Sequence, residues 1–323
     1  MPTWHEFGGF LVESGIPLTA IAEVAEHPGR RPDVLVRVVD APAAPGVTWQ
    51  HHWLHADKSE TLSLSVEGDR YRLRVPGLCD FVLAPKERSV AVSPLYKLCP
   101  WTLEHLLLDQ ILPRWFALEG HILLHAALLE IDGVGVLLVG DSGAGKSTLA
   151  AMLQGAGHPV LSDDAVLLAR EEGDFLARGT YASIRLNPDA YLGAMGANSP
   201  VLGPVASYND KVRVEVASLP AHERLPVRAI YQLGANLAPG TSPRVSALTP
   251  RAACISLLRQ AFAVDLRDPA QMQPILRFHG QLAASVPVFE LAYPRQFDAG
   301  HALVSRLLAH VRGLARQEAE SAA

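Results

Sequence analysis

The sequence has few cysteines, no excess of basic charge and no long apolar run. Its three cysteines, Cys79, Cys99 and Cys254, are far apart and lack C-x-x-C spacing, so they predict neither a disulfide framework nor a cysteine-rich zinc site. The 28 Lys and Arg residues against 33 Asp and Glu residues give a formal net charge of −5. A chain of this charge has no basic field to attract nucleic acid or acidic lipid, so neither is expected as a partner.

The apolar stretches are too short for a membrane helix. The longest, 122–131 and 134–139, fall well short of the ~20 residues that a bilayer requires, and the N-terminus lacks the pattern of a signal peptide. We therefore expect a cytoplasmic protein without a membrane partner. With 49% hydrophobic residues over 323 positions, the chain has enough apolar material for a globular fold of about two domains.

The first hundred residues predict mainly strands. Apolar and polar residues alternate over 62–66 and 71–75 around Glu67-Gly68-Asp69, which predicts a hairpin. The segments 33–39 and 81–83 are further predicted strands, and the Pro/Ala stretch 41–45 predicts a loop.

The pattern then changes to a helical period over 102–118. Thr102 is the predicted N-cap, and Pro113 is expected to bend or split this helix. We place a domain boundary just before it, at 97–101. The predicted parts are a mainly-β domain of unknown role (1–97), a catalytic domain (98–316) and a frayed tail (317–323).

The second domain predicts an α/β fold. Two apolar strands, 126–131 and 134–139, flank the Asp132-Gly133 pair, which is a strong hairpin signal. Further strands are predicted at 159–161, 212–216 and 227–233, and helices at 250–263, 271–284 and 298–315.

A glycine-rich motif follows the second strand of that hairpin. It is the G-x-x-x-x-G-K-[ST] pattern formed by Gly140, Asp141, Ser142, Gly143, Ala144, Gly145, Lys146 and Ser147. A strand before it and a helix over about 146–153 give the context in which backbone N–H groups surround a phosphate. Lys146 would reach the β- and γ-phosphates, Ser147 would bind Mg²⁺, and Thr148 completes the predicted nucleotide-binding set. The predicted cofactors are ATP and Mg²⁺.

Two adjacent carboxylates, Asp163 and Asp164, end the short strand at 159–161. One carboxylate beside a phosphate loop can hold the metal while the other accepts a proton from an incoming hydroxyl. The alternative is a solvated acidic turn. His125 opens the strand that leads toward the loop, and by itself it fits either a hydrogen-bonded core histidine or a catalytic group.

These segments together resemble the catalytic core of HPr kinase/phosphorylase. The similarity covers 125–131, 135–147 and 157–164, and it implies a P-loop kinase core related to phosphoenolpyruvate carboxykinase rather than to eukaryotic protein kinases. The resemblance implies that Asp163 is the acid/base for a serine hydroxyl. It also implies that Asp164 and Ser147 support the metal, and that His125 orients or tunes the acid/base pair.

The chain departs from the family after the paired aspartates. Family members carry an acidic residue just before an Arg-Gly pair, whereas Phe175-Leu176-Ala177-Arg178-Gly179 has apolar residues there, so a metal ligand is missing or supplied elsewhere. The segments 183–190 and 211–213 instead resemble a divergent branch found in peptide natural-product pathways, including lasso-peptide kinases. Arg185, Lys211 and Arg213 are candidates to neutralise the transferred phosphoryl group, or else are surface cations.

The leading hypothesis is an ATP-dependent kinase that phosphorylates a serine or similar hydroxyl of a peptide or small protein. The alternatives are a small-molecule kinase on the same core and a non-catalytic ATP-binding switch. A homo-oligomer is compatible with the resemblance, because the parent family forms hexamers.

Overall fold

The computed structural model describes residues 2–25, 29–40, 46–54, 57–196, 199–216 and 223–322. The chain forms two compact units, each with its own internal contacts. The first comprises Met1–His121, Val205–Asn209 and Phe262–Pro274, and the second comprises Ile122–Pro204, Asp210–Ala261 and Ile275–Ala323. The loop predicted at 41–45 lies outside the described residues.

The first unit is built on one mixed sheet with the strand order β1-β2-β3-β8-β7-β6-β5-β4. Its strands are β1 (Thr3–Phe7), β2 (Phe10–Ser14), β3 (Val34–Val38), β4 (His51–Leu54), β5 (Glu60–Glu67), β6 (Arg70–Val75), β7 (Cys79–Ala84) and β8 (Ser89–Pro94), with a 3-10 turn, η1, at Pro85–Glu87. The predicted hairpin is confirmed as β5–β6, whose last pair is Glu67 with Arg70. Leu64 and Leu73 pair across it and are fully buried.

The predicted helix over 102–118 is present, and Pro113 divides it. It consists of α1 (Pro100–Leu106), a π-helical turn η2 (Leu107–Ile111) and α2 (Leu112–Leu118). A proline has no N–H to donate into the preceding turn, so the helix changes its hydrogen bonding there. The N-cap prediction is wrong: the cap is Cys99, because Pro100 takes the first helical position, and the Thr102 hydroxyl instead accepts the Ser207 N–H at 2.9 Å.

This helix groups with the N-terminal sheet, on the other side of the predicted boundary. The Phe116 ring stacks on those of Phe7 and Phe10, with ring centres 5.9 and 4.1 Å apart. The buried Glu104 carboxylate accepts the Ala20 N–H at 2.7 Å. Contacts between residues this far apart leave no local sequence signal. The sequence showed only a change from strand to helix period at 102, and that change alone suggested a boundary.

The second unit contains the sheet that positions the glycine-rich loop. Its strand order is β12-β10-β11-β18-β14-β13-β9, with β20 also beside β18 and β19 beside β20. Of these strands, β11 is parallel to β18 and β18 is parallel to β20. The bounds are β9 (Ile122–Leu124), β10 (Ala126–Ile131), β11 (Val134–Val139), β12 (Val160–Ser162), β13 (Val166–Glu171), β14 (Asp174–Gly179), β18 (Leu225–Asn236), β19 (Arg244–Ala247) and β20 (Val288–Tyr293).

The predicted hairpin β10–β11 is confirmed, with Ile131 paired to Val134. Its turn residues Asp132 and Gly133 both have positive φ, 53° and 83°. A two-residue turn of this conformation matches the twist of antiparallel strands, which is why Asp-Gly is so strong a signal. A separate small sheet, in the order β15-β17-β16, comprises β15 (Ile184–Leu186), β16 (Val201–Pro204) and β17 (Val212–Val214).

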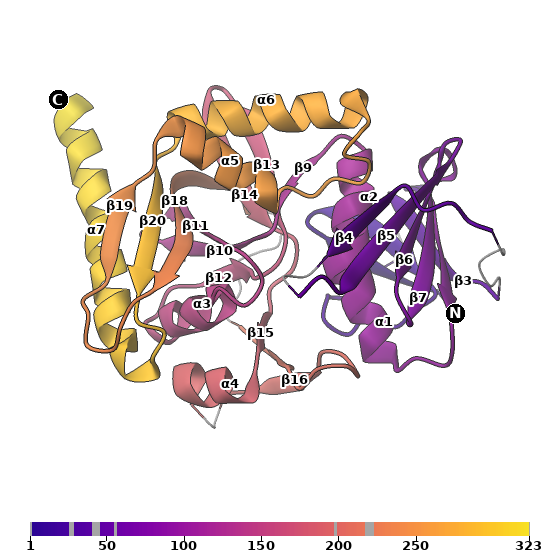
Figure 1. Cartoon of the computed structure of the whole chain (residues 1–323), viewed down its shortest axis with the longest axis horizontal. Coiled ribbons are helices and arrows are strands. Elements are labelled where there is room, and N and C mark those ends of the chain that lie inside the picture. The colour runs from indigo at the N-terminus through magenta and orange to yellow at the C-terminus, as the bar shows by residue number, and fades with distance from the viewer. Residues whose placement is uncertain are drawn as a thin grey trace. The chain divides into compact units, whose positions relative to one another are not determined.

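Helices cover both faces of the larger sheet (Figure 1). Residues of α3, α4 and α7 pack with Leu129, Leu138 and Tyr231 in one core, and residues of α5 and α6 pack with Leu128, Leu137 and Ile230 in the other. The bounds are α3 (Lys146–Gly155), α4 (Pro188–Met195), α5 (Pro250–Gln260), α6 (Pro269–Ser285), a 3-10 turn η3 (Phe297–Ala299) and α7 (Gly300–Ala322). The strands β11 and β10 therefore present successive side chains to opposite cores, as alternation requires.

The predicted C-terminal tail is helical in the structure. Helix α7 continues to Ala322, whereas fraying was expected from 317. The segment 316–322 contains Ala, Gln, Glu and Arg, which favour helix, and no Gly or Pro that would end it. Among the described residues, no helix combines the length and apolar character needed to cross a membrane.

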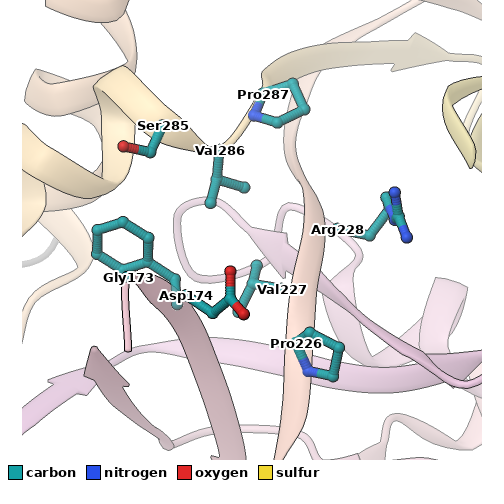
Figure 2. Close-up of a pocket in the computed structure, with 9 residues that line it drawn as sticks. Gly173, Asp174, Pro226, Val227, Arg228, Ser285, Val286 and Pro287 are labelled. Carbon is teal, nitrogen blue, oxygen red and sulfur yellow. The ribbon is translucent and has the colours of Figure 1, made fainter. Parts of the chain in front are cut away.

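A hollow of about 370 Å³ opens beside the first residues of β18 (Figure 2). Its lining includes Asp174, Phe175, Pro226, Val227 and Arg228. Val227 lies next to Gly135 at the start of β11, whereas the glycine-rich loop follows the other end of that strand. This hollow is therefore at the opposite edge of the sheet from the loop and contains no predicted site residue.

Candidate active site

The glycine-rich loop joins β11 to α3. Strand β11 ends at Val139, Gly140 to Gly145 form the loop with Asp141, Ser142, Gly143 and Ala144 between them, and α3 begins at Lys146. Gly143 and Gly145 have φ of 79° and 100°, a region that side chains with a Cβ rarely adopt. A Cβ on Gly145 would also lie 2.9 Å from the Tyr293 hydroxyl. The loop thus needs its glycines for conformation and for space.

Lys146 is folded back over the loop. Its Nζ donates to the carbonyl oxygens of Gly140 and Asp141, at 2.6 and 3.4 Å, and only 6% of the residue is exposed. Burial lowers the pKa of Lys146, and the nearby Asp164 and Asp163 oppose that shift. The predicted residues Ser147 and Thr148 follow in the first turn of α3. A cation and the N-terminus of a helix therefore converge on the loop, as a phosphate site requires.

The paired aspartates are buried, in contrast to a solvated acidic turn. Strand β12 ends at Ser162, and Asp163 and Asp164 are 3% and 6% exposed. The Ser162 hydroxyl donates to the Ala165 carbonyl oxygen at 2.7 Å and closes the turn that holds them. Buried carboxylates require partners, and these come from β15, α3 and the segment before β10.

Asp163 has one satisfied oxygen and one without a partner. Its Oδ2 accepts the Arg185 backbone N–H at 3.2 Å, and its side chain is hydrogen-bonded to the Ser147 hydroxyl. Within the described part of the chain, Oδ1 is buried with no hydrogen-bond partner. Burial, and then the neighbouring Asp164 charge, raise the pKa of Asp163 to about 6. The side chain is thus suited to exchange a proton near neutral pH.

Asp164 is held by Arg185 and His125. Its Oδ2 forms an ion pair with the Arg185 guanidinium, and its carbonyl oxygen accepts a hydrogen bond from His125 Nδ1 at 2.9 Å. Because a carbonyl oxygen can only accept, this contact fixes the proton of the neutral ring on Nδ1. Burial, with the Lys146 charge second, lowers the pKa of His125 to about 4. His125 is therefore neutral at physiological pH and lies next to the aspartate pair.

The other predicted cations lie on the small sheet. Arg185 on β15 and Arg213 on β17 are paired across these strands, and Lys211 precedes Arg213 by two residues. Arg213 is 3% exposed and donates to the Ser183 hydroxyl at 3.3 Å, which is unlike an ordinary surface cation. Lys211 is only partly buried. The Arg213 side chain is buried and that of Arg185 is largely so, and two such cations directly opposite each other are unfavourable unless negative charge lies near them.

Sequence reasoning missed two residues that reach the loop from far along the chain. The backbone carbonyl oxygen of Gln260 accepts a hydrogen bond from the backbone N–H of His125 at 2.7 Å. The side-chain amide of Gln260 donates to Asp141 Oδ1 at 3.3 Å. Arg295 donates to the carbonyl oxygens of Gly143 and Gly234, at 3.5 and 3.2 Å. Neither residue belongs to a motif, so nothing in the sequence pattern indicated these contacts.

Two of the apolar residues at 175–179, Phe175 and Ala177, pack in the interior of the second unit. Ala177, at the place of the acidic residue in the family pattern, is 1% exposed and belongs to the apolar core beneath α5 and α6. Gly179 lies so close to β12 that an added Cβ would be 2.2 Å from the Leu161 carbonyl oxygen. The chain therefore keeps the glycine of the Arg-Gly pair and has no carboxylate at 177.

The comparisons with known proteins agree with this geometry. Residues 117–185 match the family model described as the HPr Serine kinase C-terminal domain. Residues 117–185 therefore form an HPr kinase-like core. The matched segment of this HPr kinase-like core runs from α2 through the glycine-rich loop and the paired aspartates to Arg185, and it leaves out the sheet of the first unit.

The curated relatives of the HPr kinase-like core match over the same short region. The HPr kinase/phosphorylase of Mycoplasmopsis pulmonis is 40% identical over 62 residues, 19% of this chain and 20% of that protein. That of Peptoclostridium acidaminophilum is 50% identical over 52 residues, 16% of this chain and 17% of that protein. The chain thus aligns with 17–20% of the length of these relatives.

A solved structure, the Hpr(Ser) kinase/phosphatase of Coxiella burnetii, is 16% identical and covers 62% of this chain and 95% of that chain, with a TM-score of 0.34.

Magnesium fits the residues of the HPr kinase-like core. The described residues contain no group of three or more His, Cys, Asp or Glu side chains that could hold a metal ion by themselves. Mg²⁺ commonly uses one or two protein oxygens and completes its shell with water and substrate phosphates. The Ser147 hydroxyl and Asp164 Oδ1 are oxygens of the kind it prefers, since Asp164 Oδ2 already pairs with Arg185, and the buried Asp163 Oδ1 without a described partner lies beside them.

Proposed function

We propose that this protein is an ATP-dependent kinase that transfers the γ-phosphate to a serine or similar hydroxyl of a peptide or small protein. The observation that carries the proposal is Asp163. It is a buried carboxylate with a pKa raised to about 6, it has one oxygen without a partner in the described part of the chain, and it is hydrogen-bonded to the residue after Lys146.

In the proposed reaction the loop and Lys146 hold the triphosphate of ATP. Asp163 accepts the proton of the acceptor hydroxyl as its oxygen bonds to the γ-phosphorus, and the bond between that phosphorus and the β,γ-bridging oxygen breaks to release ADP. His125 and Arg185 hold Asp164 beside Asp163, so that the pair keeps one orientation. Mg²⁺, bound by Ser147 and Asp164, would supply charge neutralisation at the phosphates.

Arg185 and Arg213 would stabilise the charge of the transferred group. Their pairing on adjacent strands puts the two guanidinium groups on one face of the small sheet, and Lys211 immediately precedes β17. Phosphoryl transfer depends mainly on positioning and on such charge neutralisation. The serine acceptor is supported by the matching family model, whose description names a serine kinase.

The test is transfer of labelled γ-phosphate from Mg·ATP to serine-bearing peptides, with small hydroxyl metabolites as a parallel set of acceptors. We expect labelled phosphoserine with the wild type and none with Lys146→Ala. Label on metabolites alone would favour a small-molecule kinase. Binding of ATP without transfer to any acceptor would favour a nucleotide-dependent switch. Equal labelling by Lys146→Ala would contradict the proposed donor site.

A further inference from the structure

The phosphate loop leaves the nucleoside of a bound nucleotide to be held by other residues. Strands β11, β18 and β20 are parallel neighbours, so their carboxyl ends lie at the same edge of the sheet as the loop. In open α/β sheets, ligands bind across the carboxyl ends of adjacent strands. The segment that follows β20 at this edge is 294–299, which leads into α7.

Arg295 connects this segment to the loop. Its guanidinium donates through one terminal nitrogen to the Gly143 carbonyl oxygen and through the other to that of Gly234, and its backbone N–H donates to Asn236 Oδ1 at 2.9 Å. The N–H groups of a guanidinium lie in its plane, so these two bonds do not use its flat faces. Arg295 is also exposed.

The same segment also contacts α3, the helix that begins at the end of the loop. Thr148 and Met152 are four residues apart and share one face of α3. Met152 contacts the end of the segment, since a Cβ on Gly300 would be 3.1 Å from its sulfur. Phe297, in the same segment, packs its ring against Gly193 of α4, and 40% of it is exposed.

We propose that Arg295 and Phe297 form the nucleobase subsite and hold the base by stacking. The inference rests on the proposed nucleotide donor. A guanidinium plane and an aromatic ring are the two protein groups that stack most readily on a base. Since stacking uses the flat face of the guanidinium and of the Phe297 ring, which carries no hydrogen-bond donor, the contact depends on the area of the base rather than on its hydrogen-bonding edge. Purine nucleotides should therefore bind more tightly than pyrimidine nucleotides, and ATP and GTP should bind alike.

The experiment compares the dissociation constants of Mg·ATP, Mg·GTP, Mg·CTP and Mg·tripolyphosphate, which has the phosphates without the nucleoside. For Arg295→Ala and for Phe297→Leu we expect affinity for ATP and GTP to fall about tenfold and affinity for tripolyphosphate to stay within about twofold. Arg295→Lys keeps the charge and loses the plane, so it should bind ATP as weakly as Arg295→Ala. Arg277→Ala, which removes an exposed arginine of α6 on the other face of the sheet, is the matched control and should bind all four as the wild type does.

Three results would overturn the subsite. One is an equal loss of ATP and tripolyphosphate affinity in Arg295→Ala, which would mean that Arg295 acts only on the loop. Another is full recovery of ATP binding by Arg295→Lys, which would mean that charge and not stacking matters. The third is a discrimination between ATP and GTP of a hundredfold or more. The proposed function fails separately, when Lys146→Ala retains the wild-type affinity for ATP and tripolyphosphate alike.

Discussion

Arg185 contacts both members of the aspartate pair, through its guanidinium with Asp164 and through its backbone N–H with Asp163. One residue of β15 thus sets the position of the two carboxylates that end β12, about twenty residues earlier in the chain. The two contacts differ in their consequences. The ion pair gives the charged Asp164 a counter-charge. The backbone bond lowers the pKa of Asp163, but burial and the Asp164 charge outweigh it, and the second oxygen of Asp163 has no described partner.

Asp163→Asn should abolish transfer and preserve nucleotide binding. The amide has nearly the same shape but cannot accept the hydroxyl proton, so kcat should fall by about 10²- to 10⁴-fold. Affinity for Mg·tripolyphosphate, measured by calorimetry, should change little, because the loop and Lys146 remain. A variant that retained transfer within a few-fold of the wild type would exclude Asp163 as the base.

The pH profile should show the ionisation of Asp163. Since a general base acts in its ionised form, kcat/KM should rise with pH and level off above about 6, the raised pKa of this group. Stability should move in the opposite direction. The folded state holds this proton more tightly than the unfolded chain, so between about pH 4 and about pH 6 the free energy of unfolding should fall as pH rises. The stability of Asp163→Asn should not show this fall between about pH 4 and about pH 6. A wild-type kcat/KM that stays constant over this pH range would contradict the assignment of Asp163 as the general base.

Arg185→Gln should destabilise the fold far more than the loss of an exposed ion pair. It leaves the buried Asp164 carboxylate without its counter-charge, which typically lowers the free energy of unfolding by about 3–5 kcal/mol. Arg312→Gln is the control, because Arg312 and Asp132 form an exposed pair whose loss should change the free energy of unfolding very little. Both are measured by urea denaturation. The double variant Arg185→Gln with Asp164→Asn should recover part of the loss, and no recovery would mean that the ion pair is not its cause.

Gly179→Ala should be destabilising even though alanine is a small residue. Its Cβ would be 2.2 Å from the Leu161 carbonyl oxygen, so β12 or β14 must move, at a typical cost of about 1–3 kcal/mol. Gly280→Ala is the matched control. That glycine is in α6 with no atom near its added Cβ, so alanine should raise stability by about 0.5–1 kcal/mol. Equal thermal midpoints for the two variants would show that β12 and β14 are not packed this closely.

Local sequence signals predicted the elements that begin and end within one motif. The Asp132-Gly133 turn, strand β11, the glycine-rich loop and the start of α3 each follow from neighbouring residues, and the structure contains all of them. The grouping of α1 and α2 with the first unit did not follow, because it depends on rings such as Phe10 and Phe116 that are about a hundred residues apart. Propensity and periodicity act over a few turns and cannot report such contacts.

The same limit applies to the candidate site. Lys146, Asp163, Asp164 and His125 stood out because each lies in a short segment with a chemical reason for its residue types. Gln260 and Arg295 contact the loop from 119 and 152 residues away and belong to no pattern. The Asp163 pKa of about 6 is likewise a property of the burial and charge assembled around it, which a sequence does not display.

The pairing of β11 with β18 limits how much of this sheet can form while the chain is still being synthesised on the ribosome. β11 ends at Val139, but its parallel partner begins only at Leu225, so one edge of β11 stays open while the intervening chain is synthesised. A nascent chain that ends soon after Arg185, or a fragment trimmed to 117–185, would expose that edge to other chains. A segment cut to the residues that match the HPr Serine kinase model would therefore lack the strand that covers this edge of β11.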